Sequence, residues 1–178
     1  MKKLLFLILF IFGMNLTFAQ DNFDLSTLRI GPYTVFMKNK DVEKFSKSKL
    51  TSFMGDDDYM KTNKVNYLGE VIEISIMQNY DDQGQNTGGY QIYSLMTKSK
   101  KFRTKSGMGV GSTKDQLIDA YRNYPNFSVA QMWDEKTEKI STTKSTFTLT
   151  DNDAGTLLSF IMINNVVTEV SVFMNEGC

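Results

Sequence analysis

The sequence predicts an α+β protein built from two related halves, each with one helix followed by antiparallel strands. The first half is expected at residues 20–105 and the second at residues 106–178. Helix-type apolar spacing occurs after Asn39 and again after Thr113, and alternating apolar residues follow each of these segments. The order helix, strands, helix, strands is typical of an α+β fold rather than of alternating βαβ units.

The chain begins with a segment typical of a secretory signal peptide. Lys2 and Lys3 precede an apolar run from Leu4 to Phe12, and Ala19 places a small residue at the expected cleavage point. The run is shorter than the ~20 apolar residues that span a bilayer. We therefore expect residues 1–19 to be removed, which leaves a periplasmic or extracellular chain with at most peripheral membrane contact. An uncleaved membrane anchor is the alternative.

Composition excludes several classes of function. The full chain has 20 basic and 20 acidic residues, and Lys2 and Lys3 lie in the expected signal peptide, so the mature chain is slightly acidic and is not expected to bind nucleic acid. The sequence contains no histidine, which excludes Ser-His-Asp and Cys-His nucleophilic sites and histidine-ligated zinc. Cys178 is the single cysteine, so it either pairs with another chain or is an incidental terminal residue.

The first half is expected to start with an extended segment at residues 28–37. The helix after Asn39 would place Val42 and Phe45 on one face, and a loop is expected at residues 55–58. Three isoleucines alternate with polar residues at 71–77 and predict a half-buried strand. A glycine-rich turn or hairpin loop at residues 81–89 leads into another expected strand at residues 90–96.

The second half is expected to start with a capped helix. Ser112 or Thr113 would be the N-cap, with Asp115 in the position of a capping box relative to Ser112. Leu117 and Tyr121 then share an apolar face before Pro125 ends the helix. Strands are expected near residues 147–149, 157–163 and 166–174, with a tight turn at Asn164-Asn165 between the last two.

The glycines that precede this helix do not form a nucleotide-binding motif. Lys114 comes two residues too late after Gly111 for a P-loop. The spacing of Gly107, Gly109 and Gly111 lacks both the Rossmann pattern and the hydrophobic strand that must precede it. We expect a flexible turn that leads into a capped helix, with weak anion binding at the helix N-terminus as the alternative.

The other candidate catalytic and metal-binding residues are explained more simply as polar residues of the solvent-exposed surface. Residues 46–49 and 141–144 match S-x-x-K but lack the accompanying S-D-N and K-T-G elements. Several acidic residues are candidates for glycoside hydrolysis or for calcium binding. The sequence indicates no cleft to hold a catalytic carboxylate pair, and no acidic cluster has the spacing of an EF-hand calcium loop. The acidic candidates are Glu70 with Glu73, Asp134 with Glu135, Asp56 to Asp58, Asp81 with Asp82, and Asp151 with Asp153. No catalytic residue, metal ligand or cofactor is therefore predicted.

A basic segment at residues 98–105 is the main candidate binding site. It carries Lys98, Lys100, Lys101, Arg103 and Lys105. These residues would bind an anionic surface such as lipid headgroups or a polysaccharide, or would protect an edge strand against aggregation. Aromatic residues are a further candidate recognition surface, although some must be core: Tyr59, Tyr67, Tyr80, Tyr90, Tyr93 and Trp133.

The second half resembles a known family. Gly109 to Leu117, followed by Tyr121 and Pro125, is similar to the helix entry of beta-lactamase-inhibitor-protein-like domains and of small outer-membrane-assembly lipoproteins. Residues 158–170 resemble their final hairpin, whereas Asn123-Tyr124 and the lack of a lipid-bearing cysteine depart from the pattern. The resemblance implies tandem helix-plus-sheet units that bind proteins without catalysis.

These observations together predict a secreted or periplasmic, non-enzymatic protein-binding module, either an inhibitor or an envelope-assembly factor. Its partner would be another envelope or secreted protein, and its oligomeric state is left open. The alternative is an envelope-surface module that binds glycan or lipid through a basic edge strand. A third hypothesis, a small enzyme, would require a deep pocket with titratable residues of perturbed pKa.

Overall fold

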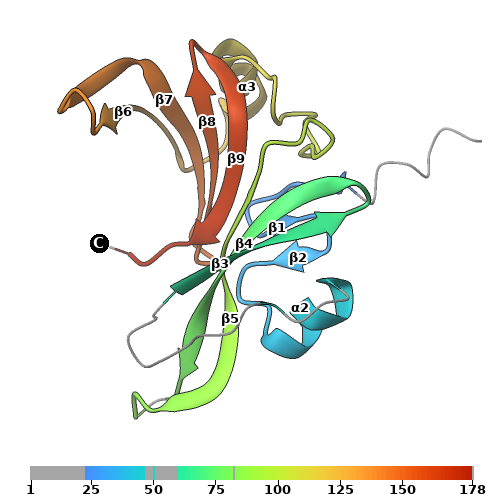
Figure 1. Ribbon diagram of the computed structural model, residues 1–178. Helices are drawn as coiled ribbons and strands as arrows, with labels where there is room; N and C mark the ends of the chain where they lie inside the picture. The colour runs from blue at the N-terminus through green and yellow to red at the C-terminus, as the bar shows by residue number, and fades with distance from the viewer. Residues whose placement is uncertain (1–22, 47–49, 51–59, 82, 178) are drawn as a thin grey trace, which may run out of the picture.

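A seven-stranded antiparallel sheet forms the body of the protein (Figure 1). The computed structural model describes residues 23–46, 50, 60–81 and 83–177. In spatial order the strands are β3 (Met60–Tyr67), β4 (Glu70–Tyr80), β5 (Asn86–Thr97), β9 (Val166–Met174), β8 (Thr156–Ile163), β7 (Lys139–Asp151) and β6 (Phe127–Asp134). The other described elements are the short hairpin of β1 (Arg29–Ile30) and β2 (Tyr33–Thr34) and the helices α2 (Asn39–Ser46) and α3 (Lys114–Tyr121).

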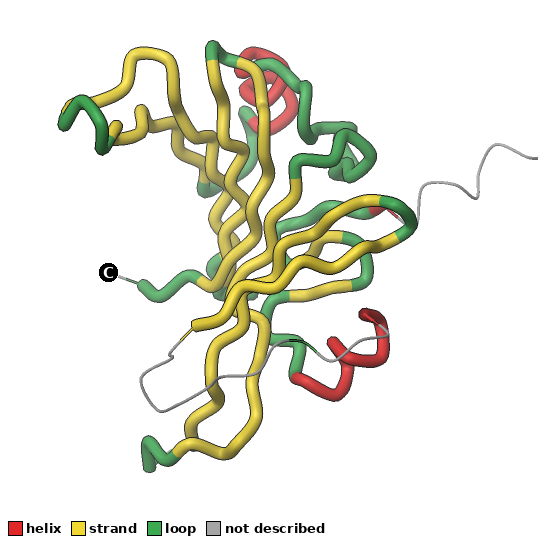
Figure 2. Tube along the Cα trace, viewed as in Figure 1, coloured by secondary structure: helices red, strands yellow, loops and turns green. Residues whose placement is uncertain are grey.

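The predicted α+β fold of two helix-plus-sheet halves is wrong. Strands dominate the described chain, and its two helices have eight residues each (Figure 2). The sheet is continuous, because β5 pairs with β9 from Ser94 opposite Phe173 to Thr97 opposite Val170. The architecture is therefore a single β-sheet-dominated body.

The prediction from sequence underestimated the strand content because it missed the two edge strands, β3 and β6. In β3 only Val65 is buried, and β6 has no buried residue. An edge strand with little burial lacks the regular apolar alternation by which a half-buried strand is recognised. The strands at 71–77, 90–96, 157–163 and 166–174, in contrast, are confirmed as parts of β4, β5, β8 and β9.

The core lies on the face of the sheet that both helices cover. Ile72, Ile74 and Ile76 of β4 are fully buried there, as their alternation predicted. Tyr121 of α3 packs on Phe147 and Phe160, with ring centroids 6.0 and 6.2 Å away. These side chains belong to one apolar cluster that also includes Val42 of α2 and Leu117 of α3.

The opposite face is lined by hydroxyl groups and half-buried apolar side chains. Thr62 and Ser75 share a hydrogen bond of 2.9 Å across β3 and β4, and Thr148 and Ser159 share another of 2.9 Å across β7 and β8. Hydrogen-bonded cross-strand pairs of this kind stabilise the sheet itself. This face therefore contributes polar cross-strand contacts, and the large buried aromatic rings lie on the other face.

The start of α3 is fixed by a capping box and by pairing with β9. Thr113 is the N-cap, and its hydroxyl accepts a hydrogen bond from the Gln116 amide while the Gln116 side chain accepts one from the Thr113 amide. Thr113 was predicted as a cap, but the box partner is Gln116 rather than Asp115. Gly111 N–H donates to the Val167 carbonyl at 2.8 Å, which ties the preceding loop to the sheet.

Two turns show why particular residues occupy them. Asn164 and Asn165 have φ of 52° and 64°, which confirms the predicted tight turn between β8 and β9. At Gly109, a Cβ atom would lie 2.4 Å from the Phe102 carbonyl oxygen, so close backbone packing requires glycine there. The glycine-rich stretch before α3 therefore packs closely against the backbone of the preceding residues at Phe102.

Three predictions concern residues outside the described part of the chain: the signal peptide at 1–19, the loop at 55–58, and Cys178. Among the described residues, no helix has the length and apolar character needed to cross a membrane.

Candidate functional site

The predicted basic segment lies in a connection and not in an edge strand. Residues 98–105 follow the end of β5 and lead toward α3. Because β5 itself is flanked by β4 and β9, this segment has no role in protecting a sheet edge. The expectation of a basic edge strand is corrected accordingly.

Most cations of this segment have partners within the protein. Lys98 Nζ lies 3.5 Å from Glu169 Oε2, and Lys101 Nζ lies 2.8 Å from Glu70 Oε1. Lys101 also lies over the ring of Phe23, 5.3 Å from its centroid, and Arg103 donates to the Ser112 hydroxyl. Lys100 and Lys105 are exposed and make no ion pair with any described residue. The five residues therefore do not act as one free cationic patch.

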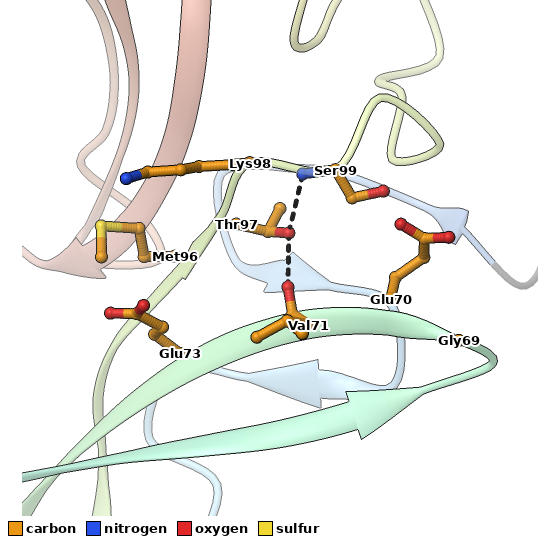
Figure 3. A pocket seen from close by; sticks show the side chains of 8 residues that line it. All are labelled: Gly69, Glu70, Val71, Glu73, Met96, Thr97, Lys98 and Ser99. Atoms are coloured by element: carbon orange, nitrogen blue, oxygen red, sulfur yellow. Dashed lines mark hydrogen bonds between the residues drawn. The ribbon is translucent and has the colours of Figure 1, made fainter.

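A pocket of about 300 Å³ lies beside this segment, between β4 and the end of β5 (Figure 3). Glu70 and Glu73 line it from opposite ends, and Glu73 pairs with Lys64 at 3.1 Å. Between them, the Thr97 hydroxyl donates to the Val71 carbonyl at 2.7 Å and accepts from the Ser99 amide at 3.2 Å. Both carboxylates are thus held by lysines, so they are poorly arranged as an acid–base pair.

Glu70 provides a direct test of this ion pairing. Hydrogen bonding by Lys101, followed by that of Ser99, lowers the pKa of the Glu70 carboxyl below its ordinary value. A lowered pKa stabilises the folded state above the unfolded pKa, and this contribution is lost as the pH falls through the folded value. Replacing Lys101 with Met should raise the Glu70 pKa in an NMR titration of the carboxyl. Lys64→Met, which removes the partner of Glu73, should leave the Glu70 pKa unchanged, and an equal response to both changes would contradict the assignment.

The S-x-x-K match at residues 141–144 has a structural role. The Ser141 hydroxyl accepts hydrogen bonds from the amides of Thr143 at 3.3 Å and Lys144 at 3.0 Å. It therefore stabilises an irregular stretch of β7, where the register with β6 shifts between Gln131 and Trp133. Part of the other match, residues 47–49, lies outside the described chain.

The acidic clusters are parts of turns. Asp81 accepts hydrogen bonds from the amides of Gln83 and Gln85, and Asp151 accepts from the Ala154 amide and the Thr27 hydroxyl. Asp56 to Asp58 and Asp82 lie outside the described residues. Within the described ranges, no three acidic or cysteine side chains are close enough together to hold a metal ion.

The structure separates core aromatic residues from surface ones. Tyr90 is buried, Tyr93 is half-buried, and Tyr67 packs edge-on against Phe23 and Tyr33. Tyr80 and Trp133 are 46% and 60% exposed. Tyr59 lies outside the described chain. The predicted aromatic surface is therefore reduced to two exposed rings on different strands.

Exposed apolar side chains lie along β6 and at the adjoining start of β7. Trp133 of β6 lies directly opposite Ile140 of β7, and the two side chains are 60% and 61% exposed. Phe127 and Val129 of the same strand are also exposed. Figure 1 shows the β6–β7 hairpin extending from the body of the sheet. We call Phe127, Val129, Trp133 and Ile140 the β6 edge surface.

The two edges of the sheet differ in their protection against further pairing. The β3 edge carries Lys61 and Lys64, and lysines on an edge strand discourage pairing with another chain. The β6 edge has neither lysine nor proline from residue 127 to residue 133. Its outer backbone groups have no neighbouring strand in the described sheet. The sequence analysis singled out Trp133 but missed Ile140, its cross-strand neighbour, which is exposed although it is apolar.

Comparison with known proteins gives no family for this chain. It matches no protein-family model, and no curated protein or solved structure is significantly similar to it. The resemblance to beta-lactamase-inhibitor-protein-like domains therefore stays a prediction.

Proposed function

We propose that this chain is a secreted or periplasmic, non-enzymatic module that binds another envelope or secreted protein. The observation that carries the proposal is the β6 edge surface, where exposed apolar side chains lie on an edge strand that has neither lysine nor proline from residue 127 to residue 133. The signal-like residues 1–19 support the location. An inhibitor and an envelope-assembly factor are the two roles that such a module would serve.

The proposed partner presents an extended segment that pairs with β6. Main-chain hydrogen bonds to the free side of the strand would supply affinity, as in other cases of strand addition. Apolar side chains of the segment would contact Trp133 and Ile140, since exposed tryptophan is a frequent centre of binding energy. The partner segment is therefore expected to be extended and rich in apolar residues.

The alternative, glycan or lipid binding through residues 98–105, has weaker support. Lys98 and Lys101 are paired with Glu169 and Glu70, and an anionic surface would have to compete with these carboxylates. Lys100 and Lys105 would be left to contact the glycan or lipid, and salt would weaken that contact because both lysines are exposed.

Retention from an envelope extract distinguishes the two functions. Immobilised residues 20–178 should retain a specific protein, identified by mass spectrometry, and that protein should stay bound at high salt. Apolar and main-chain contacts predict this result, because salt mainly screens exposed charges. Loss of all binding at high salt, or retention of glycan or lipid alone, would contradict the proposal.

A further inference from the structure

A second pocket, of about 210 Å³, lies at the end of the sheet near the start of α3. Lys114, Gln131, Lys144, Ser145, Asn164 and Asn165 are among the residues that line it. They come from the first residue of α3, from β6 and β7, and from the turn between β8 and β9. The pocket shares none of the side chains of the β6 edge surface.

Hydrogen bonds between these elements hold the pocket in shape. The Lys114 amide donates to the Asn165 carbonyl at 2.9 Å, and the Asn164 amide donates to the Thr143 carbonyl at 2.8 Å. Within β7, the Ser141 hydroxyl accepts a hydrogen bond from the Lys144 amide. These hydrogen bonds join the start of α3 to the turn between β8 and β9, and join that turn to β7. The pocket is therefore already formed when a ligand arrives.

The pocket has an excess of positive charge. Two lysines line it and no carboxylate does, while neighbouring Asp115 is exposed and is not part of the lining. No ion pair joins Lys114 or Lys144 to a described carboxylate. Lys114 is also the first residue of α3, where the helix dipole is positive and a cation is unfavourable. An anion in the pocket would relieve this repulsion.

Ser145 supplies an independent indication of a ligand. It is only 8% exposed and lines the pocket, and its hydroxyl makes no hydrogen bond with the described residues. This hydroxyl is therefore free to donate to an acceptor bound in the pocket. The amides of Gln131, Asn164 and Asn165 add donors and acceptors to the same lining.

We propose that this pocket binds an oxyanion, a carboxylate or a phosphate, carried by a hydroxylated molecule such as a sugar acid or a sugar phosphate. Lys114 neutralises the anion, the Ser145 hydroxyl donates to it, and the side-chain amides bind the hydroxyl groups of the ligand. The anion site rests on Lys114 and Ser145, which are not part of the β6 edge surface, so its test does not depend on protein binding there.

NMR titration of ¹⁵N-labelled residues 20–178 tests the site with three probes: D-glucuronate, inorganic phosphate and neutral D-glucose. At least one anion should cause saturable shifts in the amides of Lys114, Ser145 and Asn165, and glucose should not. Saturation by glucuronate alone assigns a carboxylate ligand, and saturation by phosphate alone assigns a phosphate ligand. Saturation by both assigns a general oxyanion pocket. Absence of saturable shifts with both anions, or equal shifts with glucose, would overturn the proposal.

Matched variants exclude nonspecific charge effects. Lys114→Gln should weaken the binding of the anion about tenfold, the equivalent of ~1.4 kcal/mol. Ser145→Ala should weaken it by a smaller factor, because one neutral donor is lost. Lys100→Gln removes an exposed lysine that is not part of the lining and should leave the dissociation constant unchanged. Equal losses in Lys114→Gln and Lys100→Gln would overturn the proposal, and Lys114→Gln keeps this test available if Ser145→Ala fails to fold.

Discussion

Phe160→Ala is expected to lower the free energy of unfolding by ~3–5 kcal/mol, the usual cost of removing a buried phenylalanine ring. Phe160 is fully buried on β8, and its ring centroid lies 6.2 Å from those of both Tyr121 and Phe147. Truncation would leave a cavity between α3 and the sheet, in the core on which the fold depends. Urea denaturation followed by circular dichroism measures the loss.

Phe127→Ala is the matched control for this prediction. The Phe127 ring stacks on Phe147 with 5.4 Å between centroids, but it is 39% exposed at the sheet edge. Its removal should cost only ~1 kcal/mol, because much of its apolar area already faces water. If both variants lost the same small amount of stability, the core would not lie where the structure places it.

Trp133→Lys is expected to weaken binding of the retained partner by at least about tenfold, because a central tryptophan often contributes ~2 kcal/mol or more to an interface. The substitution removes the most exposed aromatic ring of the β6 edge surface and places a charge beside the edge strand. Trp133 is 60% exposed, so stability should change by only about 0.5 kcal/mol. Surface plasmon resonance with the captured partner measures the change in affinity.

Met60→Lys makes a comparable change at the other edge of the sheet. Met60 of β3 is 46% exposed, and β3 is already protected by two lysines. This variant should bind the partner as the wild type does. Equal weakening by both variants, or by neither, would show that the β6 edge surface is not the binding site.

The sequence predicted the strands that alternate in burial and missed those that do not. The isoleucines of β4 and the Asn164-Asn165 turn have local signals, and both were recognised. The polar β3 and the exposed β6 have weak local signals. The pairing of β5 with β9 joins segments far apart in the chain, so no local pattern predicts it. That pairing makes the sheet continuous, so the fold is one β-sheet-dominated body and not the predicted α+β fold of two helix-plus-sheet halves.

The candidate site was only partly predictable for the same reason. A cluster of basic residues is visible in the sequence, but the carboxylates that neutralise Lys98 and Lys101 come from β9 and β4. Trp133 was named among several aromatic residues, but its exposure depends on the place of β6 at the end of the sheet. Which charges are free and which apolar residues are exposed are properties of the tertiary structure.

Amide hydrogen exchange on the complex tests the central claim most directly. If a partner segment adds to the sheet at β6, the backbone amides of residues 127–134 should exchange more slowly in the complex, while those of β3 should keep their rates. Unchanged exchange in β6, with protection appearing at β3 or in residues 98–105, would contradict the account.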